Sequence, residues 1–210
     1  MLAKGSLSWI GAALLLTVAT GYFSMGSNGA IKAALYILSI IGFLLTIFFI
    51  VFFRDPKRTP SGDEEDAVSP ADGRVISIKD RKLCIFMNIH NVHVNRAPLG
   101  GTVMEIDYKP GGFIPAFNKD SDVNERNHVI INTESGNLEL TQIAGVLTRR
   151  IVSYISEGNV VKRGERIGMI RFGSRVDVII PEVYTYSVDV GDKVMAGETI
   201  IARKKEKIRG

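Results

Sequence analysis

The sequence predicts a mainly β (α+β) protein, in which a β sandwich or barrel-like cytoplasmic domain follows an N-terminal transmembrane helical hairpin. Two observations lead to this prediction. Short alternating segments separated by glycine-containing turns occupy most of the chain after the first quarter, and this rhythm is typical of sandwiches and barrels. Uncharged apolar runs are concentrated before residue 54. The 210 residues therefore divide into a membrane anchor, 1–53, and one folded domain, 54–210.

Two apolar runs make up the predicted anchor. Residues 33–53 contain no charged side chain and are long enough to cross the hydrocarbon core of a bilayer as a helix. Residues 7–23 form a weaker apolar run that includes serine and threonine, and the turn-rich segment 24–29 joins the two runs. The simplest interpretation is a helical hairpin. The alternative for the first run is a signal peptide, since a lysine precedes it and small residues follow it.

Charge and cysteine content indicate the compartment. Arg54, Lys57 and Arg58 directly follow the second apolar run, so the positive-inside rule places the domain on the cytoplasmic side of the cell membrane. Cys84 is the only cysteine, which excludes an intrachain disulfide and suits a reducing compartment. The basic tail at 203–209 is either a solvated terminal segment or one that adds attraction to an anionic membrane surface. Basic and aromatic residues do not interleave as they do in nucleic-acid-binding proteins, so no nucleic-acid partner is expected.

The domain is predicted to be organised around residues 169–180. Read with a period of two, this stretch is a strand that places Ser174 on the same apolar face as Val176 and Val178. Gly173 weakens the strand and has no side chain to pack, which indicates a bulge or a close backbone approach. A small hydroxyl beside such a flexible carbonyl is a candidate nucleophile toward its own peptide bond, although most Gly-Ser dipeptides are turns.

Three other residues are candidates for chemistry. Asp72 stands before a glycine in a turn signal that precedes an alternating strand at 74–78. His90 and His93 are three residues apart, a spacing that points their rings to opposite faces of a strand unless the chain bends. Two such histidines can also bind a metal ion. No acidic or cysteine cluster completes a metal site, so none is predicted.

An amphipathic helix and an internal repeat are predicted in the second half of the chain. Apolar residues recur at helical spacing over 143–155, with Arg149 and Arg150 on the polar side. The pattern G-x-x-V-x-x-G-E-x-I then occurs at 158–167 and again at 191–200, which indicates a hairpin repeat. Lipoyl and biotin carrier domains use similar hairpins, but the lysine that they modify has no convincing equivalent in this chain.

With these segments placed, the chain resembles the phosphatidylserine decarboxylases, specifically the short, membrane-anchored class. The resemblance extends from about residue 52 to residue 202. Each motif is weak alone, whereas their order and spacing together are specific. The motifs are Phe53-Arg54-Asp55-Pro56, Ser69-Pro70-Ala71-Asp72-Gly73, His90-Asn91-Val92-His93, Asn124-Glu125-Arg126-Asn127, Gln142-Ile143-Ala144-Gly145, Gly164-Glu165-Arg166 and Phe172-Gly173-Ser174-Arg175-Val176-Asp177.

The resemblance implies a precursor that processes itself. The Ser174 hydroxyl attacks the Gly173 carbonyl, the chain is cut between these two residues, and Ser174 becomes a pyruvoyl group, the covalent cofactor. The family's Asp-His-Ser charge relay corresponds to Asp72, His93 and Ser174, and its other histidine, linked to decarboxylation, corresponds to His90. A large and a small chain then come from one precursor. Family members often form homodimers.

The implied function is pyruvoyl-dependent decarboxylation of phosphatidylserine to phosphatidylethanolamine at the cytoplasmic face of the membrane. The pyruvoyl carbonyl forms a Schiff base with the substrate amine and serves as an electron sink, and a nearby histidine returns a proton. The partner is a serine phospholipid in the bilayer, with either fatty acyl or isoprenoid ether chains. The alternative is a non-catalytic membrane-anchored barrel, such as a secretion adaptor or a carrier-like binding module. That alternative gives Ser174 and the paired histidines no role.

Overall fold

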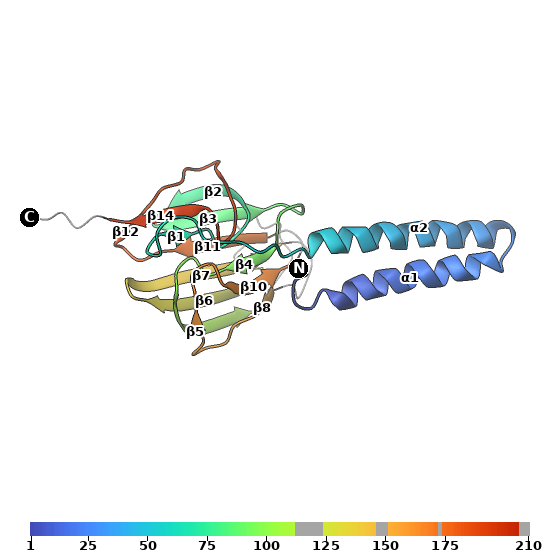
Figure 1. Cartoon of the computed structure of the whole chain (residues 1–210), viewed down its shortest axis with the longest axis horizontal. Coiled ribbons are helices and arrows are strands. Elements are labelled where there is room, and N and C mark those ends of the chain that lie inside the picture. Colours follow the sequence, from blue (N-terminus) through green and yellow to red (C-terminus); the bar gives the residue numbers. More distant parts are fainter. Residues whose placement is uncertain (112–123, 146–150, 172–173, 206–210) are drawn as a thin grey trace, which may run out of the picture. The chain divides into compact units, whose positions relative to one another are not determined.

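The computed structural model describes residues 1–111, 124–145, 151–171 and 174–205. The chain separates into two compact units, Met1–Pro56 and Lys57–Gly210. The first unit contains two helices, α1 (Leu7–Met25) and α2 (Gly29–Phe52), which lie side by side as a hairpin (Figure 1). Both helices are long and apolar enough to cross a membrane by length and composition. The predicted helical hairpin is therefore confirmed.

Small residues allow the two helices to approach closely. A Cβ atom at Gly42 would lie 2.7 Å from Thr17 Oγ1 and 2.9 Å from Thr17 N, so any larger side chain there would push the helices apart. Ser39 Oγ donates a hydrogen bond to Thr17 O at 3.0 Å across the same contact. At the open end of the hairpin, Ala3 N donates to Phe53 O at 2.9 Å, which ties the start of the chain to the end of α2.

In the described part of the second unit, the strands form one eight-stranded and two three-stranded sheets. Every pair of neighbouring strands in these sheets is antiparallel. In pairing order the large sheet contains β13 (Lys193–Val194), β2 (Gly73–Lys79), β3 (Lys82–Met87), β11 (Ser174–Ile179), β7 (Gly136–Ala144), β6 (Arg126–Thr133), β5 (Gly101–Lys109) and β9 (Val160–Val161). One small sheet contains β1 (Ala67–Val68), β14 (Ile200–Lys204) and β12 (Tyr184–Tyr186). The other contains β4 (Val94–Arg96), β10 (Arg166–Ile170) and β8 (Ile151–Ser153). The mainly β prediction is confirmed.

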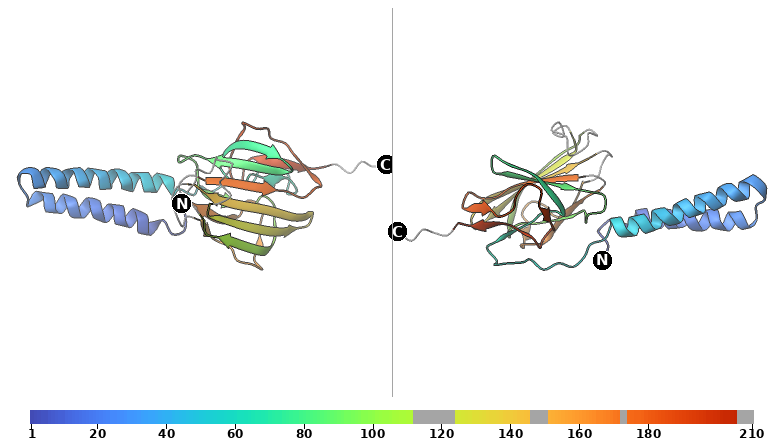
Figure 2. Two further views of the ribbon diagram at one scale, coloured as in Figure 1. Left: turned by 180° about the vertical axis from the view of Figure 1, so that it is seen from behind. Right: turned by 90° about the horizontal axis from the view of Figure 1, so that it is seen from above.

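The core of this unit lies against one face of the large sheet. Alternate residues of β3 and β11, among them Leu83, Ile85, Val176 and Val178, are fully buried, as the period of two requires for strands with one face in the core. Strand β11 lies between β3 and β7, near the middle of the large sheet (Figure 2). A side chain on β11 is therefore held by hydrogen-bonded neighbours on both sides.

The amphipathic helix predicted over 143–155 is wrong for the residues that the structure describes. Ile143 lies in β7, where it is paired with Arg126 and Arg175. Residues Ile151–Ser153 form β8 and pair with β10. The segment 146–150, with Arg149 and Arg150, lies outside the described residues. Apolar residues on two strands, β7 and the half-buried β8, recur at a spacing that also fits a helix, an ambiguity that periodicity alone does not resolve.

The single strand predicted over 169–180 is two strands in different sheets. Strand β10 ends at Ile170 in a small sheet, and β11 begins at Ser174 in the large one. Phe172 and Gly173 lie outside the described residues. The predicted alternation holds within β11, because Ser174, Val176 and Val178 are all fully buried. The alternation of apolar residues continues from β10 into β11. Such a pattern shows which residues are apolar, but it does not show which sheet a strand joins.

The internal repeat is confirmed, and it is a strand–turn–strand unit whose two strands join different sheets. The first copy connects β9 to β10, and the second copy connects β13 to β14. The strands β9 and β13 are the two edges of the large sheet, beside β5 and β2. Gly158 N donates to Val103 O and Gly191 N donates to Val75 O, each at 2.8 Å. The equivalent bonds show that each copy of the repeat makes the same contact with its neighbouring strand, β5 for the first copy and β2 for the second.

Candidate active site

Ser174 is the first residue of β11 and is held on both sides. Its Cα partners are Met87, the last residue of β3, and Ala144, the last residue of β7. The side chain is fully buried, and its hydroxyl has no hydrogen-bond partner within the described part of the chain. A buried hydroxyl normally finds a partner, and an exception in a native structure indicates a reactive group or an unseen one. The predicted nucleophile is therefore buried beside the segment that contains the predicted cleavage point, although Gly173 itself lies outside the described residues.

The two histidines follow β3 on a turn and have opposite exposures. Asn91 N donates to Asn88 O at 2.9 Å, and Asn88 N donates to Asn91 Oδ1 at 2.8 Å, so the chain bends here. His90 lies on this bend and is exposed, whereas His93 is fully buried. Nδ1 of His93 lies 2.9 Å from Asn91 O. Because a carbonyl oxygen only accepts, we assign the proton to Nδ1, which leaves Nε2 of the neutral ring as the basic nitrogen.

Two connections link His93 to the chain around Ser174. Ile170 N donates to His93 O at 3.2 Å, four residues before Ser174. The next residues, Met169 and Val94, are Cα partners between β10 and β4. On the other side, the partner of Ser174 in β3 is Met87, and the turn that carries both histidines begins directly after it. The histidine motif is thus connected at one end to β3, which pairs with Ser174, and at the other end to β10, which ends four residues before Ser174.

The side chain of Asp72 contacts the backbone of the segment that contains the histidines. The carboxylate accepts hydrogen bonds from Val92 N at 3.3 Å and from Ala196 N at 2.8 Å. It also forms a bidentate ion pair with Arg58, in which the Arg58 Nη2 to Asp72 Oδ2 distance is 2.9 Å. Asp72 is therefore buried next to the residue that precedes His93. Backbone hydrogen bonds and strand pairing thus connect the segments that contain Asp72, His93 and Ser174, while His90 lies on the exposed side of the turn.

A chain of buried amides lies beside β11. Asn127 Nδ2 donates to Gln142 Oε1 at 3.0 Å, and Gln142 Nε2 donates to Asn95 Oδ1 at 2.8 Å. Gln142 is a Cα partner of Val176 in β11, while Asn95 belongs to β4 in the small sheet. All three side chains are fully or almost fully buried. Because each amide satisfies the next, the network fixes the small sheet against the large one.

The segment 124–127 supports the residue beside Ser174. Asn124 Nδ2 donates to Ala144 O at 2.8 Å, and Ala144 N donates to Glu125 O at 2.9 Å. Both backbone groups of Ala144 are thereby used on the side away from Ser174. The Glu125 carboxylate accepts from the Tyr108 hydroxyl at 3.0 Å and from Ile151 N at 3.2 Å. Two motifs that are distant in sequence, at 124–127 and 142–145, therefore build one wall of the site.

Comparison with known proteins decides the family. Residues 45–202 match the model of the family described as phosphatidylserine decarboxylase. The chain belongs to the phosphatidylserine decarboxylase family. Membership makes it an enzyme and favours the enzymatic interpretation over a non-catalytic adaptor or carrier-like module.

Relatives in this decarboxylase family match over most of their length. A Methanosarcina mazei protein, provisionally named archaetidylserine decarboxylase proenzyme, is 49% identical over 205 residues, which cover 98% of each chain. The phosphatidylserine decarboxylase proenzyme of Streptomyces avermitilis is 47% identical over 210 residues, covering 96% of this chain and 93% of its own. That of Nitratidesulfovibrio vulgaris is 49% identical over 182 residues, covering 80% and 83%.

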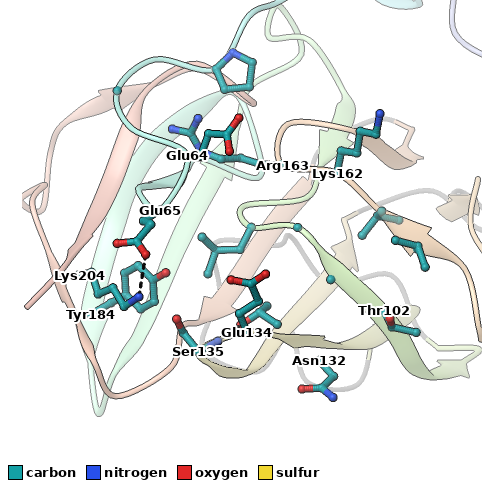
Figure 3. Close-up of a pocket in the computed structure, with 18 residues that line it drawn as sticks. Glu64, Glu65, Thr102, Asn132, Glu134, Ser135, Lys162, Arg163, Tyr184 and Lys204 are labelled. Carbon is teal, nitrogen blue, oxygen red and sulfur yellow. Dashed lines mark hydrogen bonds and ion pairs between the residues drawn. The ribbon is translucent and has the colours of Figure 1, made fainter.

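One cavity of the second unit lies away from Ser174. It has a volume of about 970 Å³ and is lined in part by Asn132–Ser135, at the turn between β6 and β7 (Figure 3). Ser174 is paired with Ala144, at the opposite end of β7. Among the residues that line the cavity, Lys204 Nζ and Glu65 Oε1 form an ion pair at 3.0 Å (Figure 3). This cavity and Ser174 therefore lie toward opposite ends of β7.

The sequence does not predict two features of this candidate site. It indicates Arg58 only as a positive charge next to the membrane, and nothing in its spacing indicates a partner 14 residues away. The amide network was also missed. Its signal was Gln142, the polar residue on the strand face that Leu138, Leu140 and Ala144 otherwise make apolar, because a buried polar side chain needs a partner of its own.

Proposed function

We propose that this protein is a pyruvoyl-dependent decarboxylase that converts a serine phospholipid to the corresponding ethanolamine phospholipid after cutting itself between Gly173 and Ser174. The observation that carries the proposal is the Ser174 hydroxyl, which is fully buried on a central strand without a partner in the described chain. Leaving such a group unpaired costs about 1–3 kcal/mol. An alanine at this position would avoid that cost if residue 174 had only a structural role.

His93 is the proposed base for self-processing. Its Nδ1 faces Asn91 O, so Nε2 is the nitrogen that takes the proton from the Ser174 hydroxyl. The hydroxyl oxygen then attacks the carbonyl carbon of Gly173, and the amide nitrogen of residue 174 leaves as an amine, which gives an ester. Elimination across the Cα–Cβ bond of residue 174 cuts the chain and leaves dehydroalanine there. Hydrolysis of dehydroalanine releases ammonia and gives the pyruvoyl group.

The surroundings of residue 174 suit a pyruvoyl group. A group formed there is held at the start of β11 between Met87 and Ala144, and the burial of the position limits access of water. The pyruvoyl group supplies a carbonyl that accepts the substrate amine and draws electrons from the carbon that bears the carboxylate. His90, on the exposed turn after β3, is the proposed donor of the proton that replaces CO2.

The anchor keeps the enzyme where its substrate lies. Serine phospholipids stay in the bilayer, and the two apolar helices hold the domain at the membrane surface, where both the headgroup and an anionic lipid surface are present. Basic residues after α2 favour the cytoplasmic side. Relatives with acyl-type and archaeal-type lipid names are about equally similar to this chain, so the serine headgroup, common to both lipids, is the proposed determinant of recognition.

Mass spectrometry of the expressed full-length protein tests self-processing. We expect two chains, of which the smaller begins at residue 174, resists N-terminal sequencing and gains mass with a carbonyl reagent such as phenylhydrazine. The Ser174→Ala variant should remain a single chain of about 23.0 kDa, because it has no hydroxyl to attack the backbone. Cleavage of that variant at the same bond, or an uncut wild-type chain, would contradict the proposal.

Release of CO2 tests the reaction itself. Processed protein should decarboxylate serine phospholipids in mixed micelles, with acyl chains, ether chains or both, and hydroxylamine should abolish the activity by trapping the carbonyl. The unprocessed Ser174→Ala protein is the matched control. Processed protein that carries the carbonyl yet releases no CO2 from either class of serine lipid would show that the substrate is wrong.

A further inference from the structure

Arg58 belongs to the linker that leads from the membrane anchor into the domain, yet its side chain is buried. The side chain of Arg58 is 7% exposed and that of Asp72 is 10% exposed. The guanidinium contacts both oxygens of Asp72 and also donates to Ala196 O at 2.8 Å. A planar guanidinium matches a carboxylate in this bidentate arrangement and fixes its orientation. The ion pair is thus a specific structure and not a surface contact.

The Asp72 carboxylate has no acceptor site left. Its two oxygens offer about four lone-pair sites. Two are used by Arg58, one by Val92 N and one by Ala196 N. A hydrogen bond from the His93 ring would be a fifth. In this arrangement Asp72 therefore acts on His93 through Val92, whose N–H it holds, and through its negative charge.

We propose that Arg58 is a positioning residue for self-processing: it holds the Asp72 carboxylate in place and thereby fixes the backbone that carries His93. The inference rests on the proposed role of His93 and Ser174. The proposed role of Arg58 needs no contact with the side chain of His93 or Ser174, because Arg58 acts through Asp72. Without Arg58 the carboxylate would be a buried charge without its counter-charge, free to turn away from Val92 N.

The internal repeat offers a matched control. In the first copy, with the strand β5 beside it, Gly100 takes the place that Asp72 has beside the second copy, and Arg163 takes the place of Ala196. A Cβ at Gly100 would lie 3.5 Å from Arg163 N, which is consistent with the equivalence. The Arg163 side chain also binds the linker, by donating to Asp66 O at 2.6 Å and to Ser61 O. Arg163 therefore anchors the same linker as Arg58 without contacting Asp72.

The experiment follows cleavage of the full chain in time. Wild type, Arg58→Gln, Arg58→Lys and Arg163→Gln are synthesised in a cell-free system with lipid nanodiscs, and conversion of precursor to two chains is measured over time. Arg58→Gln should slow cleavage by about 10- to 100-fold, since a small misplacement of a reacting group costs this much. Arg58→Lys, which keeps the charge but not the fork, should recover part of the rate, and Arg163→Gln should cleave like wild type.

Rescue by lysine separates positioning from a general loss of structure. The charged group in contact with Asp72 is Arg58, and the other contacts of the carboxylate are the backbone N–H groups of Val92 and Ala196. A lysine at position 58 restores the counter-charge of the buried carboxylate but not the bidentate contact. Partial recovery of the cleavage rate in Arg58→Lys is therefore expected of a positioning residue, whereas Arg163→Gln should keep the wild-type rate.

Two outcomes overturn the inference. One is cleavage of Arg58→Gln at the wild-type rate, and the other is slowing by the same factor in Arg58→Gln and Arg163→Gln with no recovery of the rate in Arg58→Lys. Both leave the proposed function intact provided that the wild-type chain cleaves and Ser174→Ala does not. An uncut wild-type chain would instead remove the proposed function, and with it this inference.

Discussion

Burial and the neighbouring Asp177 carboxylate raise the pKa of the Cys84 thiol to about 12. Cys84 and Asp177 are Cα partners on β3 and β11, so the thiolate would form in a partly buried site next to a negative charge. The raised pKa means that the thiol stays protonated until the solution is strongly alkaline. Because the thiolate is the reactive form of cysteine, the only sulfhydryl of the chain is expected to be inert.

This expectation can be checked by alkylation. At about pH 8.5, where a free thiol is half ionised, the folded protein should react with iodoacetamide far more slowly than a cysteine peptide, and the urea-unfolded protein should react at the peptide rate. The single cysteine makes the mass shift unambiguous. Equal rates for folded and unfolded protein would show that Cys84 is neither buried nor affected by Asp177.

For single residues, the sequence predicted which side chains are buried within a strand but not which side chains from different segments form contacts. The burial of Ser174 was predictable, because alternation within one strand decides which face a residue occupies. The Arg58–Asp72 ion pair was not predictable, since it joins a proline-rich linker to a turn, and neither segment has a periodic pattern. The spacing of His90 and His93 alone did not decide whether the chain bends between them. The structure has a turn at Asn88–Asn91, with His90 exposed and His93 buried.

At the scale of elements, the repeat depends on glycines for two different reasons. Gly158 has a φ of +81° with no atom within 4 Å of a Cβ placed there, and Gly197 has a φ of +71° with Arg96 Cδ only 2.5 Å from that position. Arg96 has little room to move, because its Nη1 donates to Gly164 O at 2.9 Å in a buried setting. The backbone conformation therefore requires glycine at both turns, and close packing requires it only at Gly197.

Alanine substitution separates the two reasons. Gly158→Ala should cost about 1 kcal/mol for the left-handed backbone, and Gly197→Ala should cost a further 1–3 kcal/mol, roughly, for overpacking against Arg96. The thermal midpoints of the two purified variants give the comparison, with wild type as reference. Equal midpoints would mean that the turn at Gly197 opens freely and that the two copies of the repeat do not pack as described.

Element types were predictable where one sheet face determines the pattern and not where the chain changes sheet. Strands β2 and β5 to β7 match alternating segments that turn signals separate. The predicted helix failed because Ile143 and Ile151 belong to strands in different sheets, and their spacing is a coincidence of the connection between them. The same limitation merged β10 and β11 into one predicted strand, since hydrophobic periodicity contains no information about which sheet a strand joins.

For the whole molecule, the arrangement of charge indicates which side of the membrane each segment occupies. Leu2 and Arg54 form a β-bridge, so Lys4 and the basic residues after α2 lie at the same end of the hairpin. The connection between the helices contains no charge, and Lys32 is the one basic residue near that end. Lysine and arginine are retained on the cytoplasmic side. The open end of the hairpin should therefore be cytoplasmic, and with it the chain that follows.

Cysteine accessibility in intact cells tests this orientation. In a Cys84→Ser background, Asn28→Cys places a thiol in the connection between α1 and α2, and Lys193→Cys places one on an exposed edge strand of the domain. A membrane-impermeant maleimide should label Asn28→Cys in intact cells and Lys193→Cys only after permeabilisation. The reverse pattern would place the domain outside the cell, away from the predicted compartment. Measuring the mass of the labelled large chain in the same experiment decides the fate of α1, because a chain that lacks it would identify the first apolar run as a removed signal peptide.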